Sequence, residues 1–291
     1  DGIRDLVRSR GLGDVYKRQQ IADLRTRDFT DSLNYAKRIQ QAIIRASLSL
    51  NEFFPESFVF LLPKAIVSGD FYWVSKLNNR ILFAIADCTG HGVPGAFMSI
   101  IGMFSLNRLV NEHNIINPGE ILNRINSLYE DSLEQSKGAE IFDGMDIALC
   151  SYNIDNQELS YAGANIPLYI LREQGLPQPA NQISYKTPTH LLYQVSPVKQ
   201  SIGEHFDRVP YITHSINLMK GDTLYLFSDG FVDQFGGTSG RKFRANELRK
   251  LIGSIVDQPL KRQQEVLMNA FYQWKGNNVQ VDDVSFMAIR I

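Results

Sequence analysis

Two hydrophobic patterns divide the chain. Between about residues 21 and 50, apolar side chains recur every three or four positions among Arg, Lys, Gln and Asp, which predicts a long amphipathic helix. From about residue 58 onward, short apolar and aromatic runs predict β-strands instead. The apolar stripe of the helix consists of Phe29, Leu33, Ala36, Ile39, Ile43, Ala46 and Leu50.

This N-terminal helix has two interpretations. It could pack on the core of the domain that follows, or it could be a coiled-coil linker that joins the domain to a sensor or to a second copy of the chain. The stripe is interrupted at Ser47 and covers about three heptads, the lower limit for a coiled coil, so both interpretations stay open. Residues 1–19 show Gly and Arg without a period and resemble a translated vector or adaptor sequence. We therefore expect a leader at 1–19, a linker helix at 20–52 and a domain at 53–291.

The remaining pattern predicts antiparallel sheets covered by helices, an α+β fold, because hairpin turns join several of the strands. Such turns are expected at Asn78-Asn79, Asp155-Asn156 and Gly221-Asp222. A long surface loop is expected over about 173–200, which contains four prolines. Strands are expected at 58–62, 71–77, 81–86, 146–153, 159–164, 167–171, 211–218, 223–228 and 284–291, and helices at 93–112, 117–136, 245–257 and 259–275.

Composition narrows the functional classes. With 291 residues, 44% hydrophobic and 21% charged, the chain is typical of a soluble globular protein. Thirty basic residues balance 31 acidic ones, so neither a nucleic acid nor an acidic membrane surface is expected as a partner. Cys88 and Cys150 form no disulfide framework or Cys-x-x-Cys motif, which favours the reducing cytoplasm. No signal peptide or membrane-spanning run is evident, so no direct membrane insertion is expected.

Two aspartates meet in the predicted hairpin around Asn78-Asn79. If these two residues form the turn, Leu77 pairs with Arg80, and the same register places Asp70 opposite Asp87 with their Cβ atoms roughly 5 Å apart. Two carboxylates at that distance repel by about 4 kcal/mol at an effective dielectric constant near 20. A shared proton or a bound cation would offset this repulsion, and glycine-rich loops at the strand ends favour a hard divalent cation.

Further aspartates stand at predicted strand ends. Asp229 follows the strand at 223–228, while Asp282 and Asp283 precede the last strand, so antiparallel neighbours would bring these acids to one end. Each aspartate could simply cap a turn. Together, Asp70, Asp87, Asp229 and Asp282 favour a Mg²⁺ or Mn²⁺ site, because all the ligands are oxygens.

These segments resemble the ordered motifs of the SpoIIE-type serine phosphatases, the bacterial branch of the protein phosphatase 2C-like (PPM) family. The resemblance covers roughly residues 53–291, and the segments at 143–153, 161–169 and 200–203 share it. The four acidic motifs are Ser68-Gly69-Asp70-Phe71-Tyr72, Ala86-Asp87-Cys88-Thr89-Gly90-His91-Gly92, Phe227-Ser228-Asp229-Gly230 and Asp282-Asp283-Val284-Ser285.

The resemblance implies an α-β-β-α sandwich of two antiparallel sheets, preceded here by the amphipathic helix, with two Mn²⁺ or Mg²⁺ ions at one end. By position, Asp87 would bridge both ions, Asp70 and the Cys88 backbone carbonyl would complete one site, and Asp229 with Asp282 would complete the other. The implied activity is hydrolysis of phosphoserine or phosphothreonine by a metal-activated water. Asp87, Asp229 and His91 are thus the candidate catalytic residues, with His91 as a general acid or merely a loop residue.

The sequence departs from the eukaryotic members at two places. Asn165 replaces an aspartate that helps to hold a third metal, so a third ion is not expected, and the phosphate-binding arginine has no clear match. Lys64 and Arg241 could contact phosphate but are more typical of solvated surface cations. Asp143 and Asp146 are expected to orient a loop.

By the same resemblance, the substrate would be a phosphorylated regulatory protein, such as an anti-sigma factor antagonist. The chain would be the output domain of a signalling protein whose upstream sensor lies outside it, with a homodimer through the N-terminal helix as one option. A catalytically weak interaction module is the alternative, although the complete set of acids argues against it. A nucleotide hydrolase is disfavoured because no phosphate-binding G-x-x-x-x-G-K-[ST] loop is present.

Overall fold

The structure is a computed structural model that describes residues 2–46, 49–90, 92–134, 144–179, 182–203, 209–238 and 240–291. For residues 2–18, 45–46 and 130–134 it describes the backbone alone. The two candidate residues His91 and Asp143 therefore lie outside the described residues.

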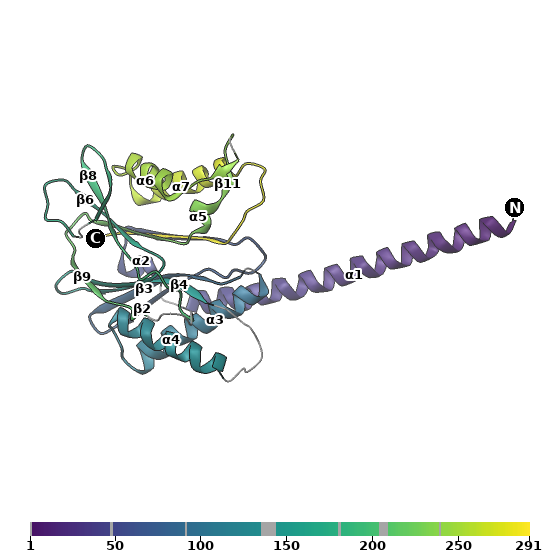
Figure 1. The fold of residues 1–291 in the computed structure, drawn as a ribbon, viewed down its shortest axis with the longest axis horizontal. Helices are drawn as coiled ribbons and strands as arrows, with labels where there is room; N and C mark the ends of the chain where they lie inside the picture. Colours follow the sequence, from purple (N-terminus) through teal and green to yellow (C-terminus); the bar gives the residue numbers. More distant parts are fainter. Residues whose placement is uncertain are drawn as a thin grey trace.

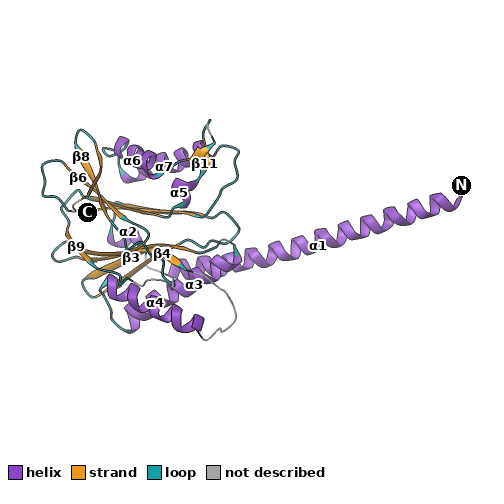
Figure 2. Ribbon diagram, viewed as in Figure 1, coloured by secondary structure: helices purple, strands orange, loops and turns teal. Residues whose placement is uncertain are grey.

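Two antiparallel sheets stack face to face between two layers of helices (Figures 1 and 2). The strand order is β1-β13-β10-β6-β8-β7 in the six-stranded sheet and β2-β3-β4-β5-β9 in the five-stranded sheet, and β11 and β12 form a small separate hairpin. This is the expected α-β-β-α sandwich. The strands are β1 (Ser57–Leu62), β2 (Phe71–Leu77), β3 (Arg80–Cys88), β4 (Met145–Asn153), β5 (Glu158–Ala164), β6 (Leu168–Glu173), β7 (Gln182–Lys186), β8 (His190–Val195), β9 (His214–Asn217), β10 (Thr223–Phe227), β11 (Phe235–Gly236), β12 (Arg241–Lys242) and β13 (Val284–Arg290).

The helices lie on the outer faces of the sandwich. One layer lies under the five-stranded sheet and the other over the six-stranded sheet (Figure 2). The predicted helices at 93–112, 117–136, 245–257 and 259–275 are confirmed, the first with a π-helical end. The helices are α1 (Gly2–Ala46), α2 (Leu50–Phe53), α3 (Val93–Asn107), the π-helix η1 (Arg108–Glu112), α4 (Pro118–Glu134), α5 (Gly230–Asp233), α6 (Ala245–Ser254) and α7 (Leu260–Lys275).

The core has three apolar layers, which explains why the central strands read as continuous apolar runs. Along β3, Leu82 and Ala84 face the cluster under α3 and α4, while Phe83 and Ile85 face the cluster between the two sheets. A third cluster joins the six-stranded sheet to α6 and α7. Strands buried on both faces hold their ends rigidly, and the candidate acids stand at such ends.

Two predictions of local structure are wrong. The expected loop over 173–200 contains β7 and β8, which extend the six-stranded sheet to its edge. Pro188 lies in the turn between these strands and the other three prolines lie outside them, so none removes a ladder hydrogen bond. The Gly221-Asp222 turn connects β9 with β10, which belong to different sheets, and is therefore a crossover rather than a hairpin.

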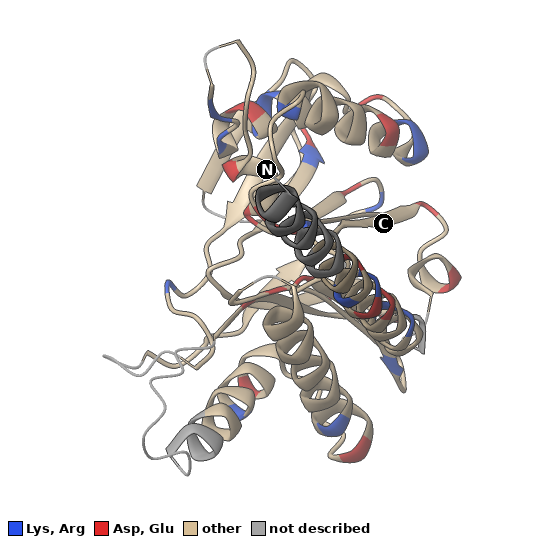
Figure 3. Ribbon diagram, turned by 90° about the vertical axis from the view of Figure 1, so that its right-hand side faces the viewer, with Lys and Arg blue, Asp and Glu red and all other residues tan. Residues whose placement is uncertain are grey.

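The last turns of α1 pack on the domain, as the first interpretation of the N-terminal pattern expects, and the coiled-coil linker stays a prediction. It runs as one helix from Gly2 to Ala46, ends four residues before the predicted boundary at residue 50, and projects away from the sandwich (Figure 1). Gln40 and Ile44 are buried against the domain, whereas Phe29 and Tyr35 are 62% and 66% exposed. The projecting part carries mixed acidic and basic side chains (Figure 3). Only the last turns of α1 thus belong to the core.

One helical run among the described residues, Val93–Glu112, is long and apolar enough by composition to span a membrane, with a mean hydropathy of 1.3 in its best window. That window is 44% buried inside the protein, and core helices of globular proteins pass the same test. The run therefore supplies only weak evidence for a membrane segment.

Candidate metal centre

The hairpin β2–β3 brings Asp70 to Asp87, as predicted. Its register pairs Leu77 with Arg80 and Phe71 with Ala86, so Asp70, which precedes β2, faces Asp87 at the other end. The two carboxyl groups are close enough for the charge of Asp70 to raise the pKa of Asp87. The turn residue Asn78 adopts φ 54°, the left-handed conformation that a two-residue hairpin turn requires.

Asp70 is the most enclosed of the candidate ligands, with 1% of its surface exposed. Its Oδ2 accepts a hydrogen bond from Ser228 Oγ at 2.5 Å, while its Oδ1 has no hydrogen-bond partner. Burial raises the pKa of Asp70 to about 7, against the lowering effect of the Ser228 hydroxyl. A buried carboxylate oxygen without a donor is costly, so this position calls for a proton or a cation.

The second pair of acids meets where β10 pairs with β13. Phe227 faces Phe286, which places Asp229 and Asp282 at the same end of the six-stranded sheet. Asp229 is exposed on one side, yet partial burial and the charges of Asp233 and Asp282 raise its pKa to about 6. Burial and then the charges of Asp70, Asp229 and Asp282 raise the pKa of Asp87. Asp87 therefore lies within electrostatic reach of the other three predicted carboxylates.

Glycines allow the two loops that carry Asp70 and Asp87 to approach closely. A Cβ atom on Gly69 would lie 2.7 Å from the Gly90 carbonyl and 3.1 Å from the Cys88 carbonyl. A Cβ atom on Gly95 would lie only 2.3 Å from the same Gly90 carbonyl. The Cys88 carbonyl is thus beside the Asp70 loop, where the resemblance predicts a backbone ligand, while the Cys88 side chain is buried in the core.

Asp283 has a different role from Asp282, which no sequence motif indicated beyond the adjacency of the two residues. Its Oδ1 accepts a hydrogen bond from Lys64 N at 2.6 Å and its Oδ2 accepts one from Gly69 N at 2.7 Å. Both of its oxygens are therefore used to hold the loop that leads to Asp70. Asp282 accepts a hydrogen bond from Asp283 N through Oδ1 at 2.8 Å and is only partly buried.

Asp146 adds a fifth carboxylate to this end of the molecule. It faces Asp87 in the β3–β4 register, and its charge contributes to the raised pKa of Asp229. Its Oδ1 accepts hydrogen bonds from Asn165 Nδ2 at 2.9 Å and from Ser201 Oγ at 2.6 Å. Asp146 thus ties three segments together, as expected of a loop-orienting residue.

The two cations weighed as phosphate contacts differ in their surroundings. The backbone N–H of Lys64 donates a hydrogen bond to Asp283. Arg241 is exposed in the short strand β12. The neighbouring Lys242, which stands in no sequence motif, forms an ion pair with Asp233 at 2.7 Å and lowers the pKa of Asp229.

The donor chemistry fits hard divalent cations. A positive charge would stabilise the buried Oδ1 of Asp70, which has no hydrogen-bond partner. It would also lower the raised pKa values of Asp70, Asp87 and Asp229. In the described part of the chain, no group of three or more Asp, Glu, His or Cys side chains stands close enough together to hold a metal ion by itself. Mg²⁺ is commonly held by one or two carboxylates with water completing its shell, which suits this open arrangement.

Comparison with known proteins gives consistent matches. The family model for Stage II sporulation protein E (SpoIIE) matches residues 78–291. Phosphoserine phosphatase RsbU of Bacillus subtilis is 24% identical over 223 residues, which cover 77% of this chain and 60% of that protein. The chain thus spans about 60% of the length of this curated relative.

Solved structures support the same fold. The SiaA-PP2C domain of Pseudomonas aeruginosa has a TM-score of 0.76 at 27% identity, covering 91% of this chain and 98% of that one. The PP2C phosphatase domain of SpoIIE from Bacillus subtilis, with a fragment of its regulatory domain, has a TM-score of 0.60 at 18% identity, covering 81% of this chain and 61% of that one.

Proposed function

The chain belongs to the SpoIIE family, and on this premise we propose that it is a metal-dependent protein serine/threonine phosphatase. The observation that carries the proposal is the convergence of Asp70, Asp87, Asp229 and Asp282 at one end of the sandwich, which follows from the β2–β3 and β10–β13 registers and from the charge interactions of Asp87 with the other three. The phosphatase relatives RsbU and SiaA-PP2C support the same reaction class.

The residues present divide into two candidate binding positions for Mn²⁺ or Mg²⁺. Asp70 and the Cys88 carbonyl would serve one ion, Asp229 and Asp282 the other, and Asp87 both. When bound, such ions lower the pKa of a coordinated water and neutralise charge on the phosphoryl group. A magnesium complex of RsbX is among the solved structures with this fold, at a TM-score of 0.51.

The protein's own contribution is to fix these groups. The Ser228 hydroxyl donates to Asp70 Oδ2 and accepts from Ser285 N at 2.9 Å, so one side chain connects both sheets at the site. Asp283 holds the loop before Asp70 by two backbone N–H groups. Because Asp229 is exposed on one side, a phosphorylated side chain can approach from there.

We propose a phosphoserine or phosphothreonine regulatory protein as the substrate, since RsbU is a phosphoserine phosphatase. The chain would act in the cytoplasm as the output domain of a longer signalling protein. The exposed apolar side chains on the projecting part of α1 support a homodimer through this helix.

The test is phosphatase activity of the purified chain on p-nitrophenyl phosphate and on a phosphoserine protein, with Mn²⁺ and with excess EDTA. We expect turnover only with metal, and its loss in Asp87→Asn. Turnover in excess EDTA would overturn the metal dependence. Inactivity under all conditions, with phosphoprotein binding retained, would favour the interaction module.

A further inference from the structure

The residue after α5, Gln234, is completely buried although it stands beside an open site. Gln234 lies five positions after Asp229 in the chain, and its side chain reaches the segment 279–281, which leads directly into Asp282. A polar side chain buried to this degree normally has its hydrogen bonds satisfied by a defined set of partners. Those partners identify what Gln234 does.

The amide of Gln234 binds the backbone of this segment on both of its polar sides. Nε2 donates to Val279 O at 3.0 Å, and Oε1 accepts from Val281 N at 3.1 Å. This combination of one carbonyl and one N–H, two residues apart, is what a neighbouring β-strand would bind. Residues 276–283 have no strand partner of their own, so the Gln234 side chain substitutes for one.

Gln234 is itself fixed from the opposite side. Its backbone carbonyl accepts hydrogen bonds from Trp274 Nε1 at 3.0 Å and from Phe243 N at 3.0 Å. The indole of Trp274 lies against the following turn, where a Cβ atom on Gly236 would lie 1.8 Å from the Trp274 carbonyl. The backbone of Gln234 is therefore held by α7 and by the residue after β12.

The segment that Gln234 holds also has contacts on its other sides. Gln280 Nε2 donates to Leu62 O at 2.7 Å and to Asp282 O at 2.8 Å, which ties the segment to the end of β1. On the Asp229 side, a Cβ atom on Gly230 would lie 1.9 Å from the Asp283 carbonyl, so α5 and residues 282–283 are in tight contact. The side-chain amide of Gln234, the residue after α5, links the end of this helix to the segment by two hydrogen bonds.

We propose that Gln234 is a positioning residue of the metal centre, which sets the place of Asp282 relative to Asp229. The inference rests on the proposed function, because it assigns these two aspartates to one ion. Outer residues that orient metal ligands typically contribute tenfold to a hundredfold to metal affinity.

The test compares Gln234→Met with Gln263→Met by calorimetric titration of the full chain with Mn²⁺. Gln263 is the matched control, since it is also completely buried but bonds Gln258 O and the Tyr225 hydroxyl, outside the segment 279–283. Methionine keeps a similar volume in both cases. We expect Gln234→Met to weaken binding of one Mn²⁺ about tenfold or more, and Gln263→Met to leave it unchanged. Melting temperatures in EDTA should fall by similar amounts in both variants.

A double-substitution cycle separates positioning from general loosening. In an Asp282→Asn background, Gln234→Met should weaken Mn²⁺ binding by less than twofold further, because the ligand that Gln234 orients is already lost. Should Gln234→Met fail to fold, Gln234→Asn, which is too short to reach both partners, is expected to give the same loss. Wild-type Mn²⁺ affinity in the Gln234 variants overturns the inference alone, whereas no Mn²⁺ binding by the wild-type chain overturns the proposed function.

Discussion

Gln40 of α1 binds the loop that carries Asp70 by hydrogen bonds to the backbone N–H and the backbone carbonyl of Ser68. Its Nε2 donates to Ser68 O at 2.6 Å, and its Oε1 accepts from Ser68 N at 3.2 Å. The same Nε2 lies 2.9 Å from Ser99 Oγ on α3. The N-terminal helix therefore contacts Ser68 directly, two positions before the candidate metal ligand Asp70.

Replacing Gln40 by Ala should destabilise the fold and weaken metal binding together. The buried N–H and carbonyl of Ser68 would lose their partner, at a cost of about 1–3 kcal/mol in the free energy of unfolding, and the Asp70 loop would loosen. Gln41→Ala is the matched control, because Gln41 is the adjacent residue of the same type and is exposed. Chemical unfolding and Mn²⁺ titration check this, and equal behaviour of the two variants would contradict it.

Removing residues 1–30 should change the oligomeric state without unfolding the domain. The truncation takes away Ile21, Leu24 and Phe29, which are 51%, 53% and 62% exposed, and keeps the buried Gln40 and Ile44. By light scattering, we expect the whole chain to be a dimer and the truncated chain to be a monomer. Any difference between their melting temperatures in dilute solution should come only from the loss of association. A monomeric whole chain would exclude the α1 dimer.

Divalent metal should stabilise the native state by binding it in preference to the unfolded chain. Asp70 and Asp87 repel when both are charged, and a cation removes that repulsion. Millimolar Mn²⁺ should therefore raise the melting temperature by several degrees, and Asp87→Asn should abolish the increase. An unchanged melting temperature in the wild-type chain would argue against a preformed site.

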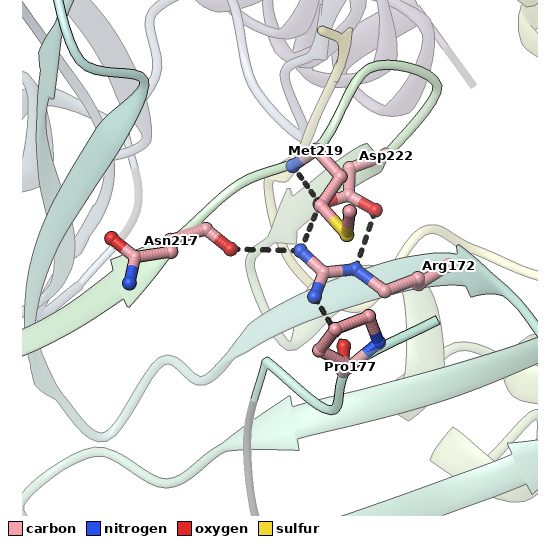
Figure 4. A network of polar contacts seen from close by, with 5 residues as sticks. All are labelled: Arg172, Pro177, Asn217, Met219 and Asp222. Carbon is pink, nitrogen blue, oxygen red and sulfur yellow. Dashed lines mark hydrogen bonds and ion pairs between the residues drawn. The ribbon is translucent and has the colours of Figure 1, made fainter. Parts of the chain in front are cut away.

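The buried ion pair between Arg172 and Asp222 should contribute to stability and not to metal binding (Figure 4). Both side chains are almost completely buried, and Arg172 also donates to Pro177 O and Asn217 O. Asp222→Asn leaves this guanidinium without its counter-charge and should cost about 3–5 kcal/mol. Glu120→Gln, which breaks the exposed Arg124 pair, should cost under about 1 kcal/mol. Urea unfolding measures both.

The sequence predicted most of what local periodicity controls. Short apolar and aromatic runs predicted most of the strands, and the Asn78-Asn79 turn set the register that brings Asp70 to Asp87. It missed β7 and β8 because four prolines dominated the pattern, although these prolines lie outside both strands. It also could not anticipate Gln234, Asp283 or Gln40, since their roles depend on hydrogen bonds between segments far apart in the chain.

Substitutions of the candidate ligands should separate binding from orientation. Asp229→Asn keeps size but removes a charge that would hold one ion, so phosphatase turnover should fall at least about a hundredfold with the fold intact. Asp87→Asn should be worse, because Asp87 would serve both ions.

Asp283→Asn provides the contrast to these ligand substitutions. Its two oxygens accept from Lys64 N and Gly69 N, and an amide NH₂ would face one of those donors, so this variant should lose stability and retain more turnover. Turnover on a phosphoserine protein and melting temperature in EDTA distinguish the two classes. A larger loss of turnover in Asp283→Asn than in Asp282→Asn, at equal stability, would move the ligand to Asp283, and near-normal turnover in all the variants would remove the two-metal proposal.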